Sequence, residues 1–466
     1  MAEKTYIDIN SGDEIVISGI AGRFPDSNNM NQLGENLFNK VDLVRADHRR
    51  WDIEHPDLPE RMGTVNNVEK FDADFFNISI EQAHALDPMA RLLLEHAYEA
   101  IVDAGINPMQ LRGKKTAVIV GMTLLESQEK FMYENLQIDG LGIIGCSKST
   151  VANILSNCLD LKGPSYTVDT ACSSSLHAIA LGYREIISGR FEDAIIGTAH
   201  LCLHPVINLN FSHLGILSSD GTCRPFDTDG SGYSRSETVS VIYLQKAKNA
   251  KRIYATCKHI KINNDGYKEE GITFPSTHMQ SILMTELYKE CGISPLFLDY
   301  MEAHGTGTKV GDLEEVNAIH NVLCKDPTDD RLPFETGFVP PNINYTSPRD
   351  DIDAFANGTI RVLTKPLALK NGYISINSFG FGGCNAHILL KWNIKQKVNN
   401  SAPSDELPRL VALSGRTRES VAKHPTDAEY IRLLHDIHAD NIEGHLWRGY
   451  VILDTSQENL ARNGQG

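Results

Sequence analysis

The sequence predicts a layered α/β protein. Two short runs rich in β-branched residues, 14–19 and 115–121, have the composition of buried strands. Between them, apolar residues recur at helical spacing in RLLLEHAYEAIVDAGI, which ends at a glycine. Because strands and helices alternate along most of the chain, we expect buried sheets that are covered by helices.

The same alternation continues further along the chain. The strand-like run PSYTVDTA leads into SSSLHAIALGYREIISG, whose apolar residues mark one face of a helix that Gly189 ends. Later strand-like runs are FEDAIIGTA, TVSVIYLQ, HIKINND, FLDYMEAHG and GYISINSFG. No short sequence repeat is present, which leaves open two half-domains of similar topology. After Trp392 the composition becomes polar and proline-bearing, as in a linker, and from Arg409 one strand, a turn and one helix are expected.

Composition limits the function classes. At 466 residues, the chain is long enough for two fused subdomains. A formal net charge of −16 disfavours binding to nucleic acids or to anionic membranes. The N-terminal segment lacks the features of a signal peptide, and no apolar run reaches the length of a membrane span, so a cytoplasmic protein is expected. Nine cysteines without CxxC spacing fit a reducing compartment and predict neither disulfides nor a metal site.

Cys172 is the candidate nucleophile. It lies between the strand PSYTVDTA and the following helix, in the motif DTACSSS. Unpaired N–H groups and the positive end of the helix dipole at this position stabilise a thiolate, so the pKa of the thiol is expected to be lowered. The same groups are suited to bind an oxyanion. Taken alone, such a cysteine is more often a small buried residue at a helix start.

The surrounding motifs resolve that ambiguity. DTACSSSLHAI, FDTDGSGYSRSE and EAHGTGTKVGD resemble the β-ketoacyl synthase (ketosynthase) region of animal-type fatty acid synthases, and the resemblance runs from about residue 13 to 391. It implies a thiolase-like fold, an α/β architecture in which a duplicated αβαβα arrangement forms five layers, and a homodimer. Residues 12–245 would form the N-terminal half with the nucleophile, and 246–393 the C-terminal half.

The resemblance also implies roles for further residues. His304, in EAHGTGT, corresponds to the first histidine of the Cys-His-His site, and Thr306 and Thr308 to positions that contact the phosphopantetheine arm. Phe381, in NSFGFGG, corresponds to the phenylalanine that gates the acyl tunnel, and with Cys172 it supplies the oxyanion hole. No tightly bound cofactor is implied, because substrates arrive on the phosphopantetheine of an acyl carrier protein domain or on coenzyme A.

The chain departs from the family after the helix LEEVNAIHNVL. There the family continues with a strand, a turn bearing the second catalytic histidine and a core helix, which this sequence lacks near residues 332–334. A strand, a turn and a helix correspond to roughly 25 to 30 residues. Among later histidines, His320 falls on an apolar helical stripe and His387 on a position not known as catalytic, so neither is expected to substitute. Residues 394–466 resemble a linker toward an acyltransferase domain that does not follow.

The function expected is that of a β-ketoacyl-[acyl-carrier-protein] synthase of fatty acid biosynthesis. Cys172 accepts an acyl group, and decarboxylative Claisen condensation with malonyl-carrier protein follows. The second step is expected to be impaired, because one preorganised donor is worth about 10² to 10³ in rate. Two alternatives are an inactive ketosynthase-like module for dimerisation or carrier-protein binding, and a fragment or isoform of a fatty acid synthase.

Overall fold

The main sheet of the computed structural model has nine strands in the order β5-β4-β6-β7-β1-β8-β13-β12-β9. The structure describes residues 12–46, 49–51, 55–130, 132, 140–324, 338–369, 372–392, 409–415, 446–453 and 462–464. The first half of the sheet contains β1 (Ile15–Arg23), β4 (Ala117–Gly121), β5 (Ser165–Val168), β6 (Asp193–His200) and β7 (Thr238–Lys246). The second half contains β8 (Ala255–Asn264), β9 (Leu298–Glu302), β12 (Tyr373–Phe379) and β13 (Cys384–Trp392).

Strand order reveals a duplication. In the first half, β4 pairs in parallel with β5 and β6, while β7 and β1 are antiparallel to their neighbours. In the second half, β9 and β12 are parallel, and β13 and β8 complete the order antiparallel. Thus β1, β4, β6 and β7 correspond to β8, β9, β12 and β13. The halves meet where β1 pairs with β8, at Ile15 with Cys257.

The helices repeat in the same way. They are α1 (Met30–Phe38), α2 (Ile80–Ala85), α3 (Pro88–Asp103), α4 (Ser127–Glu129), α5 (Leu141–Gly145), α6 (Lys148–Cys158), α7 (Ser174–Ile187), α8 (Pro205–His213), α9 (Thr277–Cys291), α10 (Lys309–Leu323) and α11 (Asp353–Ala356). Helix α3 follows the first strand of its half, as α9 does, and α6 follows the second, as α10 does. No described helix of comparable length takes the place of α7 in the second half.

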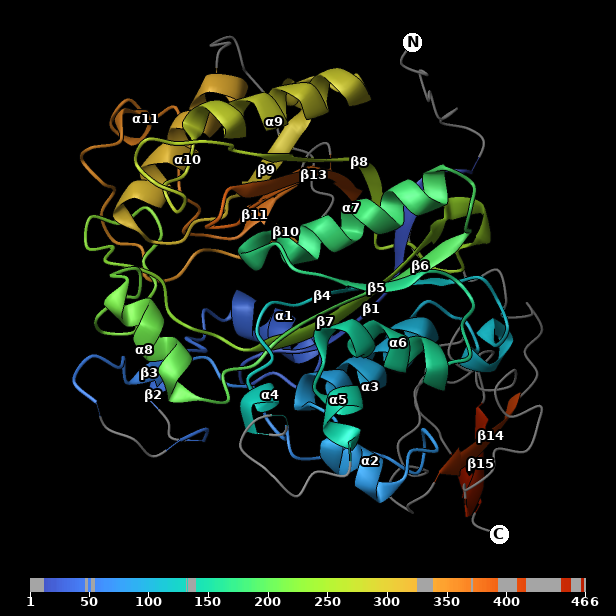
Figure 1. Cartoon of the computed structure of the whole chain (residues 1–466). Coiled ribbons are helices and arrows are strands. Elements are labelled where there is room, and N and C mark those ends of the chain that lie inside the picture. Colours follow the sequence, from blue (N-terminus) through green and yellow to red (C-terminus); the bar gives the residue numbers. More distant parts are fainter. Residues whose placement is uncertain are drawn as a thin grey trace.

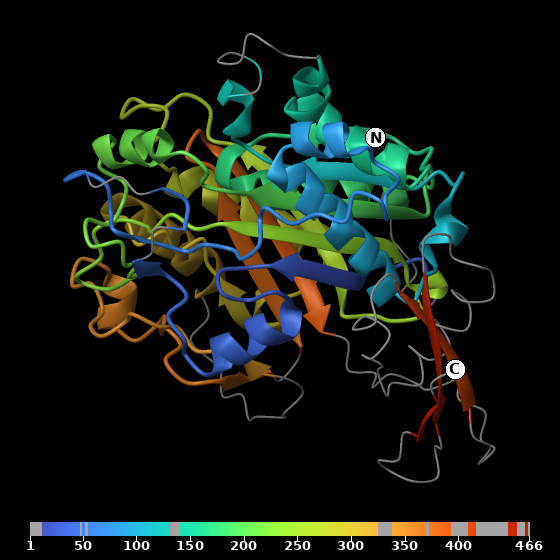
Figure 2. The same ribbon diagram turned by 90° about the horizontal axis from the view of Figure 1, so that it is seen from below.

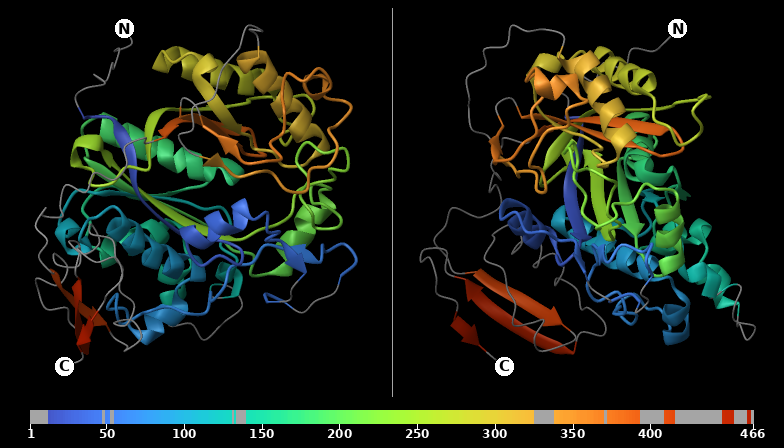
Figure 3. Two further views of the ribbon diagram at one scale, coloured as in Figure 1. Left: turned by 180° about the vertical axis from the view of Figure 1, so that it is seen from behind. Right: turned by 90° about the vertical axis from the view of Figure 1, so that its left-hand side faces the viewer.

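Five layers result, which confirms the predicted thiolase-like fold. Helices α3 and α6 cover the outer face of the first half-sheet, and α9 covers that of the second, with α10 packed on α9. Helix α7 lies between the half-sheets and contacts β4 and β6 on one side and β8 and β13 on the other (Figure 1; the view from behind is in Figure 3). Within the described residues, this central layer contains one long helix.

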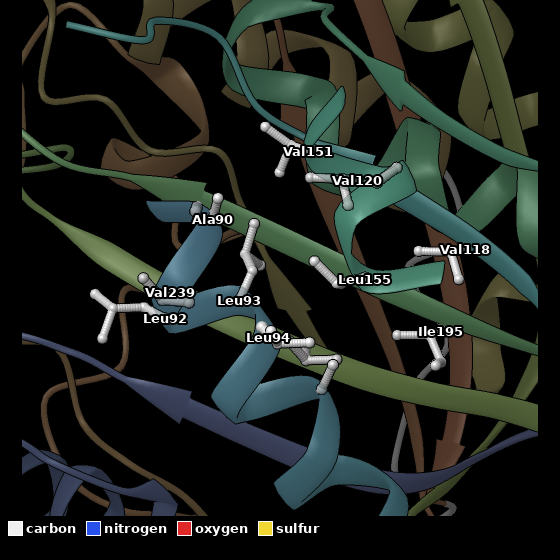
Figure 4. Close-up of a cluster of buried hydrophobic side chains, with 14 of the residues drawn as sticks. Ala90, Leu92, Leu93, Leu94, Val118, Val120, Val151, Leu155, Ile195 and Val239 are labelled. Atoms are coloured by element: carbon white, nitrogen blue, oxygen red, sulfur yellow. The ribbon is translucent and has the colours of Figure 1, made fainter. Parts of the chain in front are cut away.

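Local sequence explains the two helices that the apolar pattern predicted. Helix α3 begins at Pro88 after Asp87, whose carboxylate accepts a hydrogen bond from the Met89 N–H at 2.7 Å. Helix α7 ends before Gly189, whose φ of +73° suits a residue without a Cβ. Three consecutive leucines of α3, 92–94, are fully buried against the first half-sheet and α6, and Figure 4 shows this cluster.

Burial differs between the two halves of the sheet in the described residues. All five residues of β4 are buried, whereas none of its counterpart β9 is. On β12, Ser375, Asn377 and Phe379 are buried, while the alternating Ile374, Ile376 and Ser378 are only half-buried. Because successive side chains of a strand face opposite sides, one face of β12 is covered by the outer helices and the other is poorly covered. The poorly covered face is the one that a second central helix would pack on.

The described residues also form three smaller sheets. They pair β2 (Arg45–Ala46) with β3 (Arg61–Met62), β10 (Phe338–Val339) with β11 (Leu367–Ala368), and β14 (Arg409–Gly415), β15 (Trp447–Leu453) and β16 (Arg462–Gly464). The last sheet lies beside the main body (Figure 2). It confirms the strand predicted from Arg409, whereas the helix predicted after it lies outside the described residues. Within the described ranges, none of the helices has the length and apolar character to cross a bilayer.

Candidate active site

A cavity of about 970 Å³ opens at the carboxyl ends of the parallel strands. Its walls come from both halves, because β4 and β6 end there in the first half and β9 and β12 in the second. Crevices at the carboxyl ends of strands are the usual binding sites of open α/β sheets. All five residues predicted for the site line it: Cys172, His304, Thr306, Thr308 and Phe381. The fold therefore brings together residues that are up to 209 positions apart in the sequence (381 − 172).

The turn that presents Cys172 is held by its neighbours. Ala171 has a φ of +54°, a left-handed conformation that is costly for a residue with a Cβ. The Ser174 hydroxyl donates to the Ala171 carbonyl at 2.7 Å and accepts from the Thr170 N–H at 2.9 Å. The Ser173 hydroxyl donates to the Thr170 carbonyl at 2.9 Å. The serines after the cysteine thus fix the strained turn that precedes α7.

The electrostatics of Cys172 correct one expectation. Its thiol has a raised pKa, because surrounding protein atoms desolvate it even though the residue keeps exposed surface in the cavity. The N–H groups of Phe381 and of Cys172 itself oppose this effect, and so does Arg235, but burial dominates. The predicted lowering of the pKa was therefore wrong, because the cavity walls desolvate the thiol more strongly than the nearby N–H groups stabilise its thiolate. The same two N–H groups remain available to an oxyanion.

Alkylation kinetics test this direction. With iodoacetamide, the rate at Cys172 is expected to be below half of its maximum at pH 8.5, because the thiolate is the nucleophile and the ordinary thiol pKa is about 8.5. Mass spectrometry of the Cys172 peptide between pH 7 and 10 measures it, with Cys172→Ser as the blank. A rate that levels off by pH 7.5 would show that the pKa of the Cys172 thiol is lowered, as expected if the helix terminus outweighs desolvation.

His304 lies just beyond β9 and faces Phe379, with ring centroids 6.0 Å apart. Burial lowers the pKa of His304 to about 4, so the imidazole is neutral at pH 7. Its backbone is fixed by Glu315 of α10, which accepts from the His304 N–H at 2.7 Å and the Gly305 N–H at 2.8 Å. The Asn377 amide donates to the same carboxylate at 2.9 Å. Desolvation raises the pKa of the buried Glu315 to about 7.

Thr306 and Thr308 lie side by side at the start of α10. Their hydroxyl oxygens are 2.8 Å apart, and Thr308 is the N-cap, accepting from the Gly311 N–H at 3.2 Å. This cap is the backbone role expected for a hydroxyl in a glycine-rich turn. Both side chains also line the cavity, which leaves them accessible to a substrate arm.

Phe381 lies at the mouth of the cavity, and 45% of its surface is exposed. Its ring contacts that of Phe211 edge to face, with centroids 6.4 Å apart. Gly380 is in close contact with the turn of the nucleophile, because a Cβ there would lie 2.5 Å from the Thr170 carbonyl oxygen. A side chain at that position would push the Phe381 loop away from Cys172.

The structure adds site residues that the sequence did not identify. His200, at the end of β6, and Arg235, before β7, line the cavity with Cys172. Arg235 belongs to GYSRSE, a motif used only for the resemblance. His387 of β13 is buried, with its Nδ1 2.7 Å from the Asn377 oxygen, and is not among the residues that line the cavity. Within the part of the chain that the structure describes, no cluster of three metal-ligating side chains occurs.

Family profiles cover most of the chain. The profile described as Beta-ketoacyl synthase, N-terminal domain, matches residues 12–250, and its C-terminal domain matches 254–346. A third, Ketoacyl-synthetase C-terminal extension, matches 348–452. The chain therefore belongs to the β-ketoacyl synthase family, a class of acyltransferases.

Relatives define the type of ketosynthase. A fatty acid synthase sequence of the goose Anser anser anser is 46% identical over 344 residues, which are 74% of this chain and 97% of that sequence. The highly reducing polyketide synthase sdnO of Sordaria araneosa is 32% identical over 87% of this chain, which corresponds to only 15% of that much longer protein. The predicted resemblance to the ketosynthase region of fatty acid synthases is confirmed.

Solved structures confirm the fold. The oxazolomycin ketosynthase domain OzmH KS7 of Streptomyces albus has a TM-score of 0.78 and 28% identity, over 87% of this chain and 78% of that one. A ketosynthase from module 1 of the bacillaene synthase of Bacillus amyloliquefaciens has a TM-score of 0.80, over 96% of this chain and 86% of that one. At 24% identity, the second likeness concerns the fold alone.

Proposed function

We propose that this protein transfers an acyl group from a carrier thioester to Cys172 and that its carbon–carbon bond formation is impaired. One observation supports both parts. The first half has the complete unit of β5, the Cys172 turn and α7, while its counterpart, which in the family bears the second catalytic histidine, is missing from the described second half. Acceptance of an acyl group uses the unit of the first half, whereas condensation needs that unit and its counterpart in the second half.

The residues divide the chemistry as follows. The Cys172 thiolate attacks the thioester carbonyl, and the N–H groups of Cys172 and Phe381 stabilise the oxyanion that forms. Neutral His304 donates a hydrogen bond to the carbonyl oxygen of the extender thioester. Thr306 and Thr308 contact the phosphopantetheine arm. The Phe381 ring acts as the gate of the acyl side.

Condensation is expected to be slow because its enolate intermediate bears a full negative charge. A single neutral hydrogen-bond donor stabilises that charge only in part. Loss of malonyl carbon dioxide places a negative charge on the thioester oxygen, and His304 alone is left to stabilise it. A single missing donor of this kind costs about 10² to 10³ in rate. The protein is thus expected to hold acyl groups well and to extend them slowly.

The partners follow from the same assignment. We propose an acyl carrier protein domain or coenzyme A as the donor of substrate, a homodimeric assembly and a cytoplasmic location. The functional halves would be residues 12–245 and 246–393, and 394–466 would act as a linker toward an acyltransferase domain. The net charge of −16 suggests that any docking of an acidic carrier depends on a local basic surface.

Intact-mass measurement tests the proposal. Incubation with octanoyl-CoA is expected to add one octanoyl group to the wild type and none to Cys172→Ala. With malonyl-carrier protein added, ketoacyl product is expected to form about 10² to 10³ times more slowly than in a complete ketosynthase. No mass gain, together with retained binding of carrier protein, would favour the inactive binding module instead. Condensation at ordinary rates would contradict the impairment.

A further inference from the structure

Arg235 is a cation whose polar neighbours in the cavity wall are neutral. Its Nη2 donates to His200 Nε2 at 2.8 Å and its Nε donates to the Asn208 oxygen at 3.0 Å. Since an arginine cannot accept, His200 Nε2 is unprotonated and the imidazole is neutral. The guanidinium also stacks over the Phe211 ring, 4.8 Å from its centroid.

Two carboxylates near Arg235, those of Glu237 and Glu126, form no ion pair with it in the described part of the chain, although one oxygen of Glu126 has no hydrogen-bond partner. Glu237 forms a buried ion pair with Arg50 at 2.6 Å. Glu126 interacts with Arg235 electrostatically, but one oxygen accepts from the Leu203 and His204 N–H groups at 2.6 Å each. In the described part of the chain, Arg235 makes no ion pair with a carboxylate. A half-buried guanidinium held only by neutral groups keeps its affinity for an anion.

The cation faces the space in which an acyl group bound to Cys172 would lie. Arg235, His200, Phe211 and Cys172 all line the one cavity, and Phe211 lies between Arg235 and the proposed gate, Phe381. Arg235 acts on Cys172 directly, because its charge lowers the pKa of that thiol, although burial outweighs it. His200 stays uncharged beside it, since burial and Arg235 lower its pKa to about 3. The other cationic side chain among the residues that line the cavity is Lys309, the first residue of α10.

We propose that Arg235 is a carboxylate-binding group, so that Cys172 accepts acyl chains that carry a second carboxylate in preference to neutral chains of equal length. The inference rests on the proposed acyl transfer and specifies its substrate class. In the step itself, the Cys172 sulfur forms a bond to the acyl carbon, the bond from that carbon to the carrier sulfur breaks, and the carrier leaves as a thiol with the proton that Cys172 gave up. The second carboxylate is unchanged and pairs with the guanidinium.

Matched thioesters test the preference. Initial rates of mass gain are compared for malonyl- and propionyl-CoA, glutaryl- and pentanoyl-CoA, and suberyl- and octanoyl-CoA. One pair is expected to show a preference of about tenfold to a hundredfold for the dicarboxylic member, the size of one charge-assisted hydrogen bond. The length of the acyl chain in the pair that shows the preference indicates how far Arg235 lies from the Cys172 sulfur. Equal rates within every pair of the wild type would overturn the proposal without the need for a variant.

Variants assign the preference to Arg235. Arg235→Met keeps the length of the side chain and is expected to abolish the preference, measured as the ratio of the two loading rates within a pair, and Arg235→Lys is expected to keep part of that ratio. Arg361→Met, at an exposed arginine, controls for net charge. Equal slowing of both members of a pair by Arg235→Met would show a merely structural role. If Cys172 is loaded with neutral chains but not with dicarboxylic ones, the carboxylate subsite is contradicted and the proposed acyl transfer stands. If no thioester loads Cys172, the proposed acyl transfer is contradicted as well.

Discussion

Insertion of a complete family strand, histidine-bearing turn and core helix between Leu332 and Phe334 is expected to raise ketoacyl formation about 10²- to 10³-fold. The physical reason is a second preorganised donor to the enolate oxygen. The same insertion should cover the exposed side of β12 and so raise the free energy of unfolding, because Ile374 and Ile376 would become buried. Product formation from octanoyl and malonyl substrates and urea unfolding measure the two effects.

A second insertion separates chemistry from folding. The same segment with alanine in place of the turn histidine should restore the stability and leave condensation slow. Acylation of Cys172 should differ little among the three proteins, since β5, its turn and α7 are already complete. Equal condensation by the two inserted proteins would refute the role of the second histidine as the missing donor.

Glu315→Ala is expected to lower the free energy of unfolding by about 3 to 5 kcal/mol. The substitution leaves three buried donors without their acceptor: the N–H groups of His304 and Gly305 and the Asn377 amide. Each unsatisfied buried donor costs about 1 to 3 kcal/mol, and partial relaxation reduces the sum. Urea unfolding at pH 7 measures it. Because Glu315 fixes the His304 loop, the residual condensation should fall as well, while Cys172 acylation is retained.

The pH dependence of stability isolates the charge of Glu315. Its pKa is raised from 4.5 to about 7 in the folded protein. The unfolded chain therefore ionises first, and the stability present below pH 4.5 decreases as the pH rises toward 7. Glu315→Gln removes this titration, so the wild type should lose about 3 kcal/mol more than the variant between pH 4.5 and 7.5. Parallel curves for the two proteins would show that the carboxyl titrates normally.

The sequence predicted the helices and strands whose apolar residues follow one regular spacing or form one continuous run. Helices α3 and α7 were identified from apolar spacing and a terminal glycine, and the runs that became β1, β4, β6 and β12 from their β-branched content. The uneven burial of β12 could not be predicted, because its apolar residues occur on both faces, as in a fully buried strand. Only packing shows that one face lacks a full cover.

Motifs with a fixed local geometry predicted residues that lie together on one cavity, while their catalytic roles stay a prediction. Cys172, His304 and Phe381 each lie in a short glycine- or serine-rich turn, and the structure places all three on one cavity. Arg235 and His200 escaped notice because neither side chain has a local pattern that distinguishes a cavity wall from a surface. The direction of the Cys172 pKa shift was wrong for a related reason, since desolvation depends on atoms contributed by distant segments.

By itself, the sequence determined the α/β class, the nucleophile turn and the family. These follow from the spacing of apolar residues and from short motifs, both of which depend only on residues close together in the sequence. Its departure from the family motifs also predicts that the segment with the second histidine is missing. The tertiary structure alone decided that the described second half has no counterpart of β5 and α7, that one face of β12 is poorly covered, and that Arg235 lines the cavity of the nucleophile. Those facts depend on which distant residues pack together, and burial, pairing and electrostatic shifts are properties of that packing.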